Sequence, residues 1–236
     1  MQAQRRLGNA QGVRRLGDGP VFTFIGRVVD YLILTILCIV CSIPIVTAGA
    51  AITAKYYVSM KIVRGEEPEI IRPFFRAFKD NFRQATILWL IQMAVLGILG
   101  GDLYLLHNME HSKFNTIVGA MVLIAFVLAV MTTMAMFPLL ARFEFTIRHA
   151  LFNSVVFVMG HLLKMLYLVA LIALSIVAIY HYLNWLPLIW SVMSVIQLSL
   201  SSRMYVKEFK KVIDKKVERG EYEDPDKKED EEKELL

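Results

Sequence analysis

Charged residues and cysteines are scarce in this sequence of 236 residues. Charged side chains make up 20% of the chain and apolar ones 56%, which gives a mean hydropathy of +0.52. This composition excludes an ordinary soluble domain and indicates an integral membrane protein. A membrane-spanning helix takes roughly 20 residues, so the chain has no room for a separate catalytic domain beside its spans.

Patterns typical of several enzyme classes are absent as well. No Walker A pattern, G-x-x-x-x-G-K-[ST], occurs, so any use of ATP depends on another protein. The two cysteines, Cys38 and Cys41, form a C-x-x-C within an apolar run, where burial disfavours a reactive thiolate. The apolar runs contain neither a pair of aspartates nor a Ser–His arrangement. We therefore expect a protein that is not an enzyme and has no cofactor and no metal site.

One enzyme signature does occur, because residues 107–111 read His-Asn-Met-Glu-His and match the inverted zinc-peptidase motif H-x-x-E-H. Two histidines four residues apart can share a helix face and bind zinc, with the glutamate as base. Such a site also needs a third ligand and a substrate cleft, which the short loop at 107–116 does not supply. We interpret the match as an incidental, solvated loop segment.

Long apolar runs are what the sequence does contain, and five have the length of membrane-spanning helices. They cover residues 24–45, 85–106, 117–140, 162–182 and 186–202. A sixth segment, residues 45–63, is long enough to cross a membrane but carries Lys55 and Lys61.

The positions of the basic residues decide whether segment 45–63 crosses, because loops rich in Lys and Arg remain cytoplasmic. If it crosses, 23 of the 26 Lys and Arg residues lie on the cytoplasmic side and only Lys113 lies outside. If it lies along the interface, the basic loop 64–83 faces outward. We therefore expect an all-α, polytopic membrane bundle of six transmembrane helices with both termini cytoplasmic, and five spans are the alternative. The net charge of +5 is then a property of the cytoplasmic loops, and we expect no nucleic-acid partner.

Polar segments flank the expected transmembrane helical domain at residues 21–202. Residues 1–20 form a polar cytoplasmic N-terminus. Residues 203–220 predict a basic cytoplasmic helix, because apolar side chains recur there at helical spacing among lysines. Residues 221–236 carry nine acidic residues against three lysines, so we expect a disordered acidic tail.

The loop between the second and third expected spans contains an amphipathic segment, residues 74–83. Its aromatic residues recur at helical spacing, and basic residues fall elsewhere around the helix. The candidate interaction residues here are Phe74, Phe75, Phe78, Phe82, Arg76 and Arg83. The segment is either an elbow in the headgroup layer or a helix presented to a cytoplasmic partner. A weaker segment of the same kind covers residues 142–153.

Charges within the spans are the next candidates, because burying one in lipid is costly without a partner. Asp30 and Lys55 lie in antiparallel neighbours, so a Lys55 side chain that snorkels toward the cytoplasm could pair with Asp30. Alternatively, Lys55 lines a polar cavity or contacts another subunit. Gly97 and Gly101 form a G-x-x-x-G pattern, which lets helices approach closely either within the bundle or against another protein.

Two stretches of sequence carry a family resemblance. Residues 42–51 read Ser-Ile-Pro-Ile-Val-Thr-Ala-Gly-Ala-Ala, Ala54 and Tyr-Tyr-Val at 56–58 follow, and residues 74–84 read Phe-Phe-Arg-Ala-Phe-Lys-Asp-Asn-Phe-Arg-Gln. The chain thereby resembles the YesL family of bacterial membrane proteins, most specifically over residues 34–89. Members are often encoded beside sugar-import ABC transporters and glycoside hydrolases.

The resemblance implies a multi-pass protein of the bacterial plasma membrane that serves carbohydrate uptake. We expect a non-enzymatic accessory or regulatory subunit whose partners are the lipid membrane and the permease subunits of an ABC importer, with the ATPase as a further candidate. The alternative is a self-contained small-solute transporter or channel. That function needs a water-filled cavity near the midplane, and the spans offer few polar residues for it besides Asp30, Lys55, Gln92 and Gln197.

Overall fold

The computed structural model describes residues 20–65, 69–109, 112–143, 145–181 and 186–218, and every regular element in these ranges is helical. The elements are α2 (Pro20–Cys41), the 3-10 turn η2 (Ile45–Thr47), α3 (Ala48–Arg64), α4 (Ile71–Asn108), α5 (Lys113–Arg142), α6 (Ile147–Gly160), α7 (Leu162–His181) and α8 (Leu186–Glu218). The all-α fold class is therefore confirmed. The expected acidic tail lies outside the described residues, as do Glu110 and His111 of the H-x-x-E-H match.

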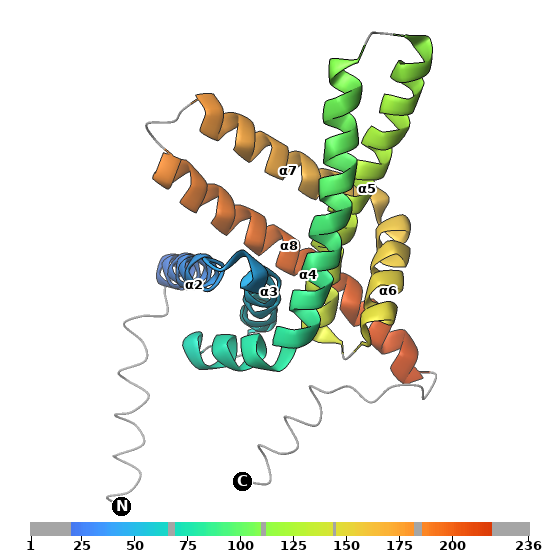
Figure 1. Cartoon of the computed structure of the whole chain (residues 1–236). Coiled ribbons are helices and arrows are strands. Elements are labelled where there is room, and N and C mark those ends of the chain that lie inside the picture. Colours follow the sequence, from blue (N-terminus) through green and yellow to red (C-terminus); the bar gives the residue numbers. More distant parts are fainter. Residues whose placement is uncertain (1–19, 66–68, 110–111, 144, 182–185, 219–236) are drawn as a thin grey trace, which may run out of the picture.

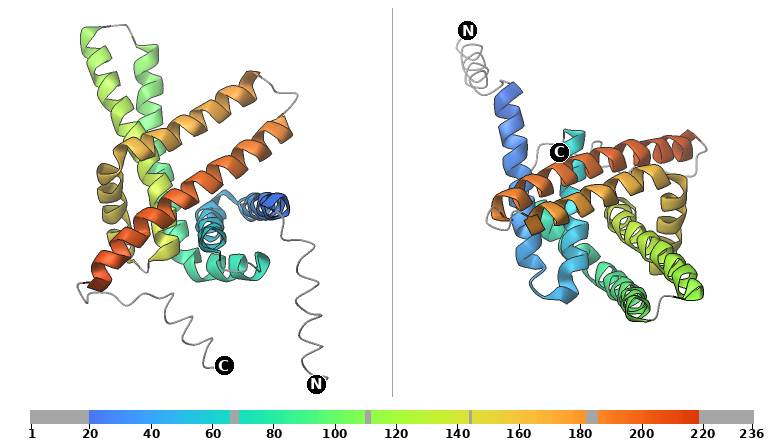
Figure 2. Two further views of the ribbon diagram at one scale, coloured as in Figure 1. Left: turned by 180° about the vertical axis from the view of Figure 1, so that it is seen from behind. Right: turned by 90° about the horizontal axis from the view of Figure 1, so that it is seen from above.

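The helices form three hairpins that point in different directions. In Figure 1 the hairpin of α4 and α5 stands upright, α2 and α3 are seen almost end on, and α7 and α8 run obliquely. The view from above in Figure 2 shows α2 and α3 lengthwise, so this pair runs across the direction of α4 and α5. The hairpins therefore do not lie parallel to one another, as they would in a simple up-and-down bundle. Short loops make the two helices of one hairpin antiparallel, but side-chain packing sets the angle between hairpins.

Among the described residues, two helices are long and apolar enough to cross a membrane: α4 with 38 residues and α5 with 30. α6 and the adjoining α7 add a third span if they count as one, although they are bent by 96° at their junction. Membrane-helix character is thus confirmed, but the count is lower than the six spans expected. α3, the second expected span, has only 17 residues and carries three basic ones, Lys55, Lys61 and Arg64.

α4 unites two segments that look separate in the sequence. The amphipathic segment 74–83 and the apolar run 85–106 lie in one unbroken helix from Ile71 to Asn108. The first turns of α4 run across the rest of the helix in both Figure 1 and Figure 2. The second expected elbow, residues 142–153, does not form one helix. Its first residue ends α5, and a new helix, α6, begins at Ile147.

The core of the molecule is built around α3, which contacts α2, α4, α5 and α8. Its residues Ala50, Ala51 and Ala54 are fully buried. A Cβ atom built on Gly49 would lie only 2.5 Å from the carbonyl oxygen of Ala85 in α4. Small residues allow such close helix contacts. The segment expected to be a second span is therefore enclosed largely by other helices of the chain.

The turn between α2 and α3 is apolar on its outside and hydrogen-bonded on its inside. The Thr47 hydroxyl lies 2.5 Å from the carbonyl oxygen of Cys41 and 2.8 Å from that of Pro44, to which it donates. The indole Nε1 of Trp89 in α4 donates to the Ile45 carbonyl over 2.8 Å. Ile43 nevertheless remains 75% exposed. The turn thus satisfies several of its backbone carbonyls through other side chains and presents an apolar tip.

Candidate functional site

The polar half of α8 carries the residues from which a functional site can be built. Tyr205, Phe209 and Ile213 recur at i, i+4 and i+8, and all three are buried. This spacing gives the helix an apolar face well past its most apolar part, which explains why α8 continues unbroken to Glu218. Several polar side chains of this part of α8 belong to two features, a charge cluster and a basic pocket.

Tyr205 fixes α8 against the centre of the molecule. It is fully buried, and its hydroxyl donates to the carbonyl oxygen of Met134 in α5 over 2.8 Å. Its ring lies 5.8 Å from that of Tyr56 in α3, edge to face, and 5.9 Å from that of Phe157 in α6. Aromatic pairs at these separations add to the stabilisation from burial. The position of the polar half of α8 is therefore set by contacts with three other helices.

The charge cluster is centred on Glu208, whose side chain is only 6% exposed. One carboxylate oxygen lies 2.5 Å from Nζ of Lys164, and the other lies 2.9 Å from Nε2 of His161. Nζ of Lys211, one turn along α8, lies 3.6 Å from the same carboxylate. A buried carboxylate needs such partners, because desolvation without them would be costly. We define Glu208, His161, Lys164 and Lys211 as the Glu208 cluster.

The Glu208 cluster ties α8 to the sharp corner between α6 and α7. His161 is the residue at this corner, where the two helices are bent by 96°. Its Nδ1 lies 3.2 Å from the carbonyl oxygen of Phe157, so one imidazole contacts both α6 and Glu208. The hydrogen bond from Lys164, followed by the one from His161, lowers the pKa of Glu208, although burial opposes this shift. Glu208 is thus held as a carboxylate that stabilises the corner.

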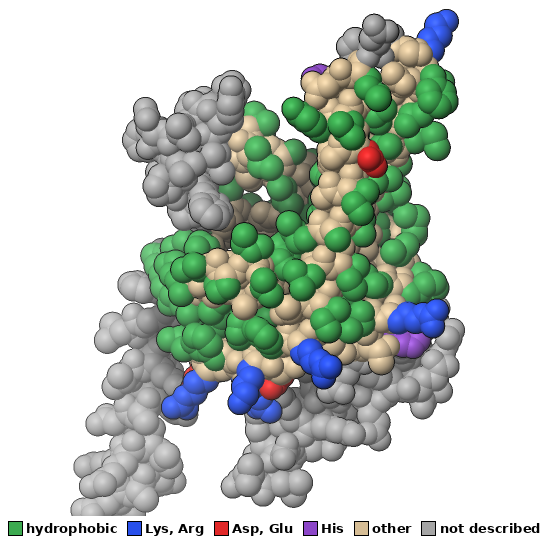
Figure 3. All heavy atoms as spheres, in the orientation of Figure 1, with side chains coloured by type: hydrophobic (Ala, Val, Ile, Leu, Met, Phe, Trp, Pro, Cys, Tyr) green, Lys and Arg blue, Asp and Glu red, His purple; other side chains and the backbone are tan. Residues whose placement is uncertain are grey.

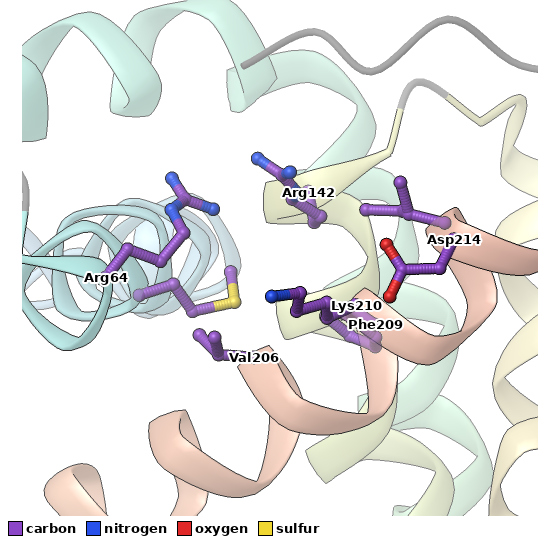
Figure 4. A pocket seen from close by; sticks show the side chains of 8 residues that line it. Arg64, Arg142, Val206, Phe209, Lys210 and Asp214 are labelled. Atoms are coloured by element: carbon purple, nitrogen blue, oxygen red, sulfur yellow. The ribbon is translucent and has the colours of Figure 1, made fainter. Parts of the chain in front are cut away.

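The basic pocket lies on the other side of α8, where the ends of α3 and α5 meet it. It has a volume of about 410 Å³ and is lined by Met60, Arg64, Arg142, Val206, Phe209, Lys210, Ile213 and Asp214. Figure 4 shows the guanidinium groups of Arg64 and Arg142 and the amine of Lys210 around one opening, with the Asp214 carboxylate to one side. Among the described residues, three cationic groups and one carboxylate line this cavity, together with several apolar side chains.

Two helix ends supply the arginines of the basic pocket. Arg64 is the last residue of α3 and Arg142 is the last residue of α5. The C-terminal end of a helix carries partial negative charge, which favours a cation at this position. Chain reversal at Gly65, in the left-handed conformation with φ 80°, ends α3 directly after Arg64. Both arginines therefore lie at helix C-termini, and both line the same pocket.

Comparison with known proteins adds one finding. Residues 31–103 match the family model DUF624, described as a protein of unknown function. The match covers the second part of α2, all of α3 and most of α4, which is less than half of the chain. No curated protein and no solved structure matches the chain.

Asp30 and Lys55 are the two charges expected within the spans. Lys55 lies in the DUF624-like segment, and Asp30 directly precedes the first residue of that segment. The ion pairs among the described residues do not include one between Asp30 and Lys55. Nζ of Lys55 instead lies 5.6 Å from the centre of the Tyr56 ring, a cation–π distance. The structure therefore does not bring these two charges together as a pair.

The aromatic residues at the start of α4 have two different environments. Phe74 is fully buried in the core, and its ring lies 6.5 Å from that of Phe78. Phe75 and Phe82 are 48% and 39% exposed. The basic residues of this segment, Arg76 and Arg83 among them, are exposed. Phe74 thus anchors the segment, whereas Phe75 and Phe82 are available to lipid or a partner.

The G-x-x-x-G pattern of the DUF624-like segment faces outward. A Cβ atom built on Gly97 or Gly101 would meet no atom within 4 Å, so neither glycine serves a close contact within the described residues. α4 and α5 are instead joined by Gln92, which is buried and whose Nε2 donates to the Ala129 carbonyl over 2.8 Å. Gly49 takes the role of the close-packing glycine within the chain.

The sequence analysis did not identify the Glu208 cluster or the basic pocket. One signal was available: Glu208 is the single acidic residue between Arg203 and Val212, and it follows Tyr205 by three positions. This spacing places a carboxylate beside the apolar face of a basic helix, where it needs a partner. The identity of that partner could not be read from the sequence, because His161 lies 47 residues away.

Proposed function

We propose that the protein is a non-enzymatic accessory or regulatory subunit that acts by contact with another membrane protein. The observation that carries this proposal is that α4 and α5 are largely exposed. In the most apolar 18-residue stretch of each helix, only 11% of α4 and 6% of α5 is buried by the rest of the chain. The upper part of this hairpin stands clear of the other helices in Figure 1. Such a hairpin has most of its surface available to lipid and to a neighbouring subunit.

The composition of the exposed α4 face favours a helix as the neighbour. Gly97 and Gly101 leave a shallow strip on that face, next to Ile98, which is 66% exposed. In lipid, where apolar surface alone gives little driving force, small residues promote association because two helix backbones can approach closely. This strip is therefore where we expect a transmembrane helix of the partner.

Charge supports an orientation for the hairpin. Lys and Arg side chains gather at the end of the molecule where α4 begins, as Figure 3 shows. At the opposite end of this hairpin there is one Lys or Arg residue, Lys113, which is the first residue of α5. By the positive-inside rule the basic end is cytoplasmic. We propose that both termini lie on this side of the bacterial plasma membrane.

The positive-inside rule requires only that both ends of the α2–α3 hairpin lie on the cytoplasmic side of the membrane. The hairpin runs across the α4–α5 direction, α3 is short for a span, and the turn at Ser42–Thr47 has no charged residue. We therefore infer that α2 enters the membrane from the cytoplasmic side and that α3 returns to the cytoplasmic side, so that the hairpin does not cross. The hairpin α4–α5 then crosses the membrane, and any even number of crossings by the helices that follow still leaves both termini inside.

The resemblance to the YesL family supports a specific partner, the permease subunits of a carbohydrate ABC importer. The exposed Phe75 and Phe82 at the cytoplasmic start of α4 provide a second contact surface, for which the importer ATPase is the candidate. The test is co-purification of the tagged protein from membranes of cells grown with and without an inducing sugar. The proposal predicts that a permease co-purifies, and recovery of the protein without any permease under both conditions would contradict it.

A self-contained transporter or channel is the alternative function. Of the polar residues that a midplane pathway would need, Gln92 is already engaged with the Ala129 carbonyl. The cavities found at α3–α8, at α4–α5 and at α7–α8 have linings that include neither Asp30 nor Lys55. Solute flux in proteoliposomes that contain only the purified protein would favour the alternative.

A further inference from the structure

We propose that the acidic tail, residues 221–236, binds to an exposed basic strip of α8. We define the α8 strip as Arg203, Lys207 and Lys210, which recur at i, i+4 and i+7 and therefore lie on one face of the helix. All three side chains are exposed. Asp214 adds one carboxylate to the same face beyond Lys210.

The α8 strip differs from the Glu208 cluster because its cations lack a carboxylate partner. Lys164 and Lys211 both lie against the carboxylate of Glu208. Among the described residues, by contrast, no ion pair involves Arg203, Lys207 or Lys210. Three exposed cations on one face attract a segment of opposite charge.

The chain supplies that opposite charge directly after α8. The acidic tail carries nine acidic residues against three lysines, a net charge of −6. It is present once for every α8 strip, and a tether of this kind gives an effective concentration of roughly millimolar. The tail is therefore the polyanion that the strip meets most often.

The acidic tail is long enough to reach the whole strip. Arg203 lies about 22 Å from Glu218, the end of α8, along the helix axis. The chain after Glu218 can span about 60 Å when it is extended. Its densest acidic run, Glu-Asp-Glu-Glu at residues 229–232, comes within about 36 Å of extended chain from Glu218. This run can therefore lie beside any residue of the strip.

Such a contact between exposed charges is weak and depends on salt, so it is reversible. While the tail is bound, the strip is shielded from anionic lipid and from acidic surfaces of other proteins. The contact lies within one chain and does not depend on the permease proposed above.

The test is carbodiimide crosslinking of the full-length protein in lipid nanodiscs, followed by mass spectrometry of the joined peptides. The reagent joins a lysine amine to a contacting carboxylate through an amide bond, so Lys207 reports contact with the strip. Arg203→Gln removes one charge from the strip but leaves Lys207 free to react. The matched control is Arg83→Gln, the same change at an exposed arginine of α4. The nanodiscs contain phosphatidylcholine, with and without phosphatidylglycerol.

We expect an amide bond between Lys207 and an acidic residue of 229–232. Its yield should fall about two- to fivefold in Arg203→Gln, stay unchanged in Arg83→Gln, and vanish at about 1 M salt, where the Debye length is about 3 Å. It should persist when phosphatidylglycerol is present. Loss of the product with phosphatidylglycerol would show that the anionic membrane occupies the strip instead of the tail. Absence of the product, or a yield that responds neither to salt nor to Arg203→Gln, would also overturn the proposal.

Discussion

Glu208 shows how one buried charge can organise a helix corner. Its carboxylate accepts from Lys164 and contacts His161, which occupies the junction where α6 and α7 are bent by 96°. A helix corner leaves backbone groups without helical partners, and a rigid side-chain network can hold it in one geometry. Glu208 therefore stabilises the packing of α8 on α6 and α7, and its side chain is too buried to contact a partner protein.

Replacing Glu208 by Gln should destabilise the protein while keeping the shape of the side chain. The change leaves Lys164 and His161 without their charged acceptor, which costs about 1 to 3 kcal/mol. The measurement is thermal or denaturant unfolding in detergent. Asp80→Asn is the control, because Asp80 forms an exposed pair with Arg76 at 3.8 Å, and such pairs contribute less than about 1 kcal/mol. Equal effects of the two substitutions would show that burial of Glu208 does not matter.

The contribution of Glu208 should depend on pH in a defined direction. The pKa of Glu208 is lowered in the folded state, chiefly by the hydrogen bond from Lys164. Its stabilisation is therefore fully present above the pKa of an ordinary glutamate, about 4.3, and is lost as the pH falls through the lowered value. Unfolding of the wild type and Glu208→Gln should converge at acid pH. A difference that persists there unchanged would contradict this explanation.

At the scale of elements, the first half of α3 packs through small residues, whereas its second half buries the larger side chains of Tyr56, Val58 and Met60. The carbonyl oxygen of Ala85 and the Cβ atom of Trp89 would lie 2.5 and 2.7 Å from a Cβ atom on Gly49. The first of these atoms belongs to the backbone of α4, which cannot move aside as a flexible side chain can. This close contact allows α3 to pack directly against the backbone of α4 at the centre of the molecule.

Gly49→Ala and Gly97→Ala form a matched pair that tests this contact. Overpacking at Gly49 should cost about 1 to 3 kcal/mol, because the added methyl group overlaps α4. Gly97→Ala should have little effect on unfolding, since no atom lies within 4 Å of its Cβ position. Unfolding of the two variants in detergent provides the comparison. A similar loss at both positions would contradict the packing described for α3 and α4.

Hydropathy and helical spacing predicted most elements but not how they meet. The apolar run 117–140 corresponds closely to α5, Lys113–Arg142, because a charge-free run of that length has few alternatives. The aromatic spacing at 74–83 predicted a helix but not its fusion with the following run into α4. The Glu208 cluster joins residues of α7 and α8 and the corner before α7, and no local pattern specifies such distant partners.

At the scale of the whole molecule, the structure supports the proposed membrane-embedded α2–α3 hairpin over two further spans, and the charge distribution is compatible with either. The turn at Ser42–Thr47 should therefore stay inaccessible to a membrane-impermeant thiol reagent added outside. The measurement uses Ile43→Cys, at a residue 75% exposed, after Cys38 and Cys41 have been replaced. Lys113→Cys, on the expected outer side, is the positive control. Labelling of Ile43→Cys from outside would restore six crossings.

The direction of the hairpins could not be predicted from the sequence, because the positive-inside rule fixes only the side on which each loop lies. Both Arg27 and Arg64 lie on the cytoplasmic side whether the segment between them crosses the membrane twice or not at all. The transverse direction of α2 and α3 in Figure 2 depends on contacts such as Gly49 with Ala85. The α4–α5 hairpin thus presents an exposed apolar surface, and α2 and α7 also expose large apolar side chains.

The most direct test of the proposed function is site-specific photo-crosslinking in intact cells from the exposed face of α4. A benzophenone amino acid at Ile98, 66% exposed, should crosslink to a permease subunit during growth on an inducing sugar. The same group at Leu88, which is fully buried, should give no such product. If no permease is captured from Ile98, so that Ile98 and Leu88 give the same result, the proposed contact of α4 with a permease does not exist.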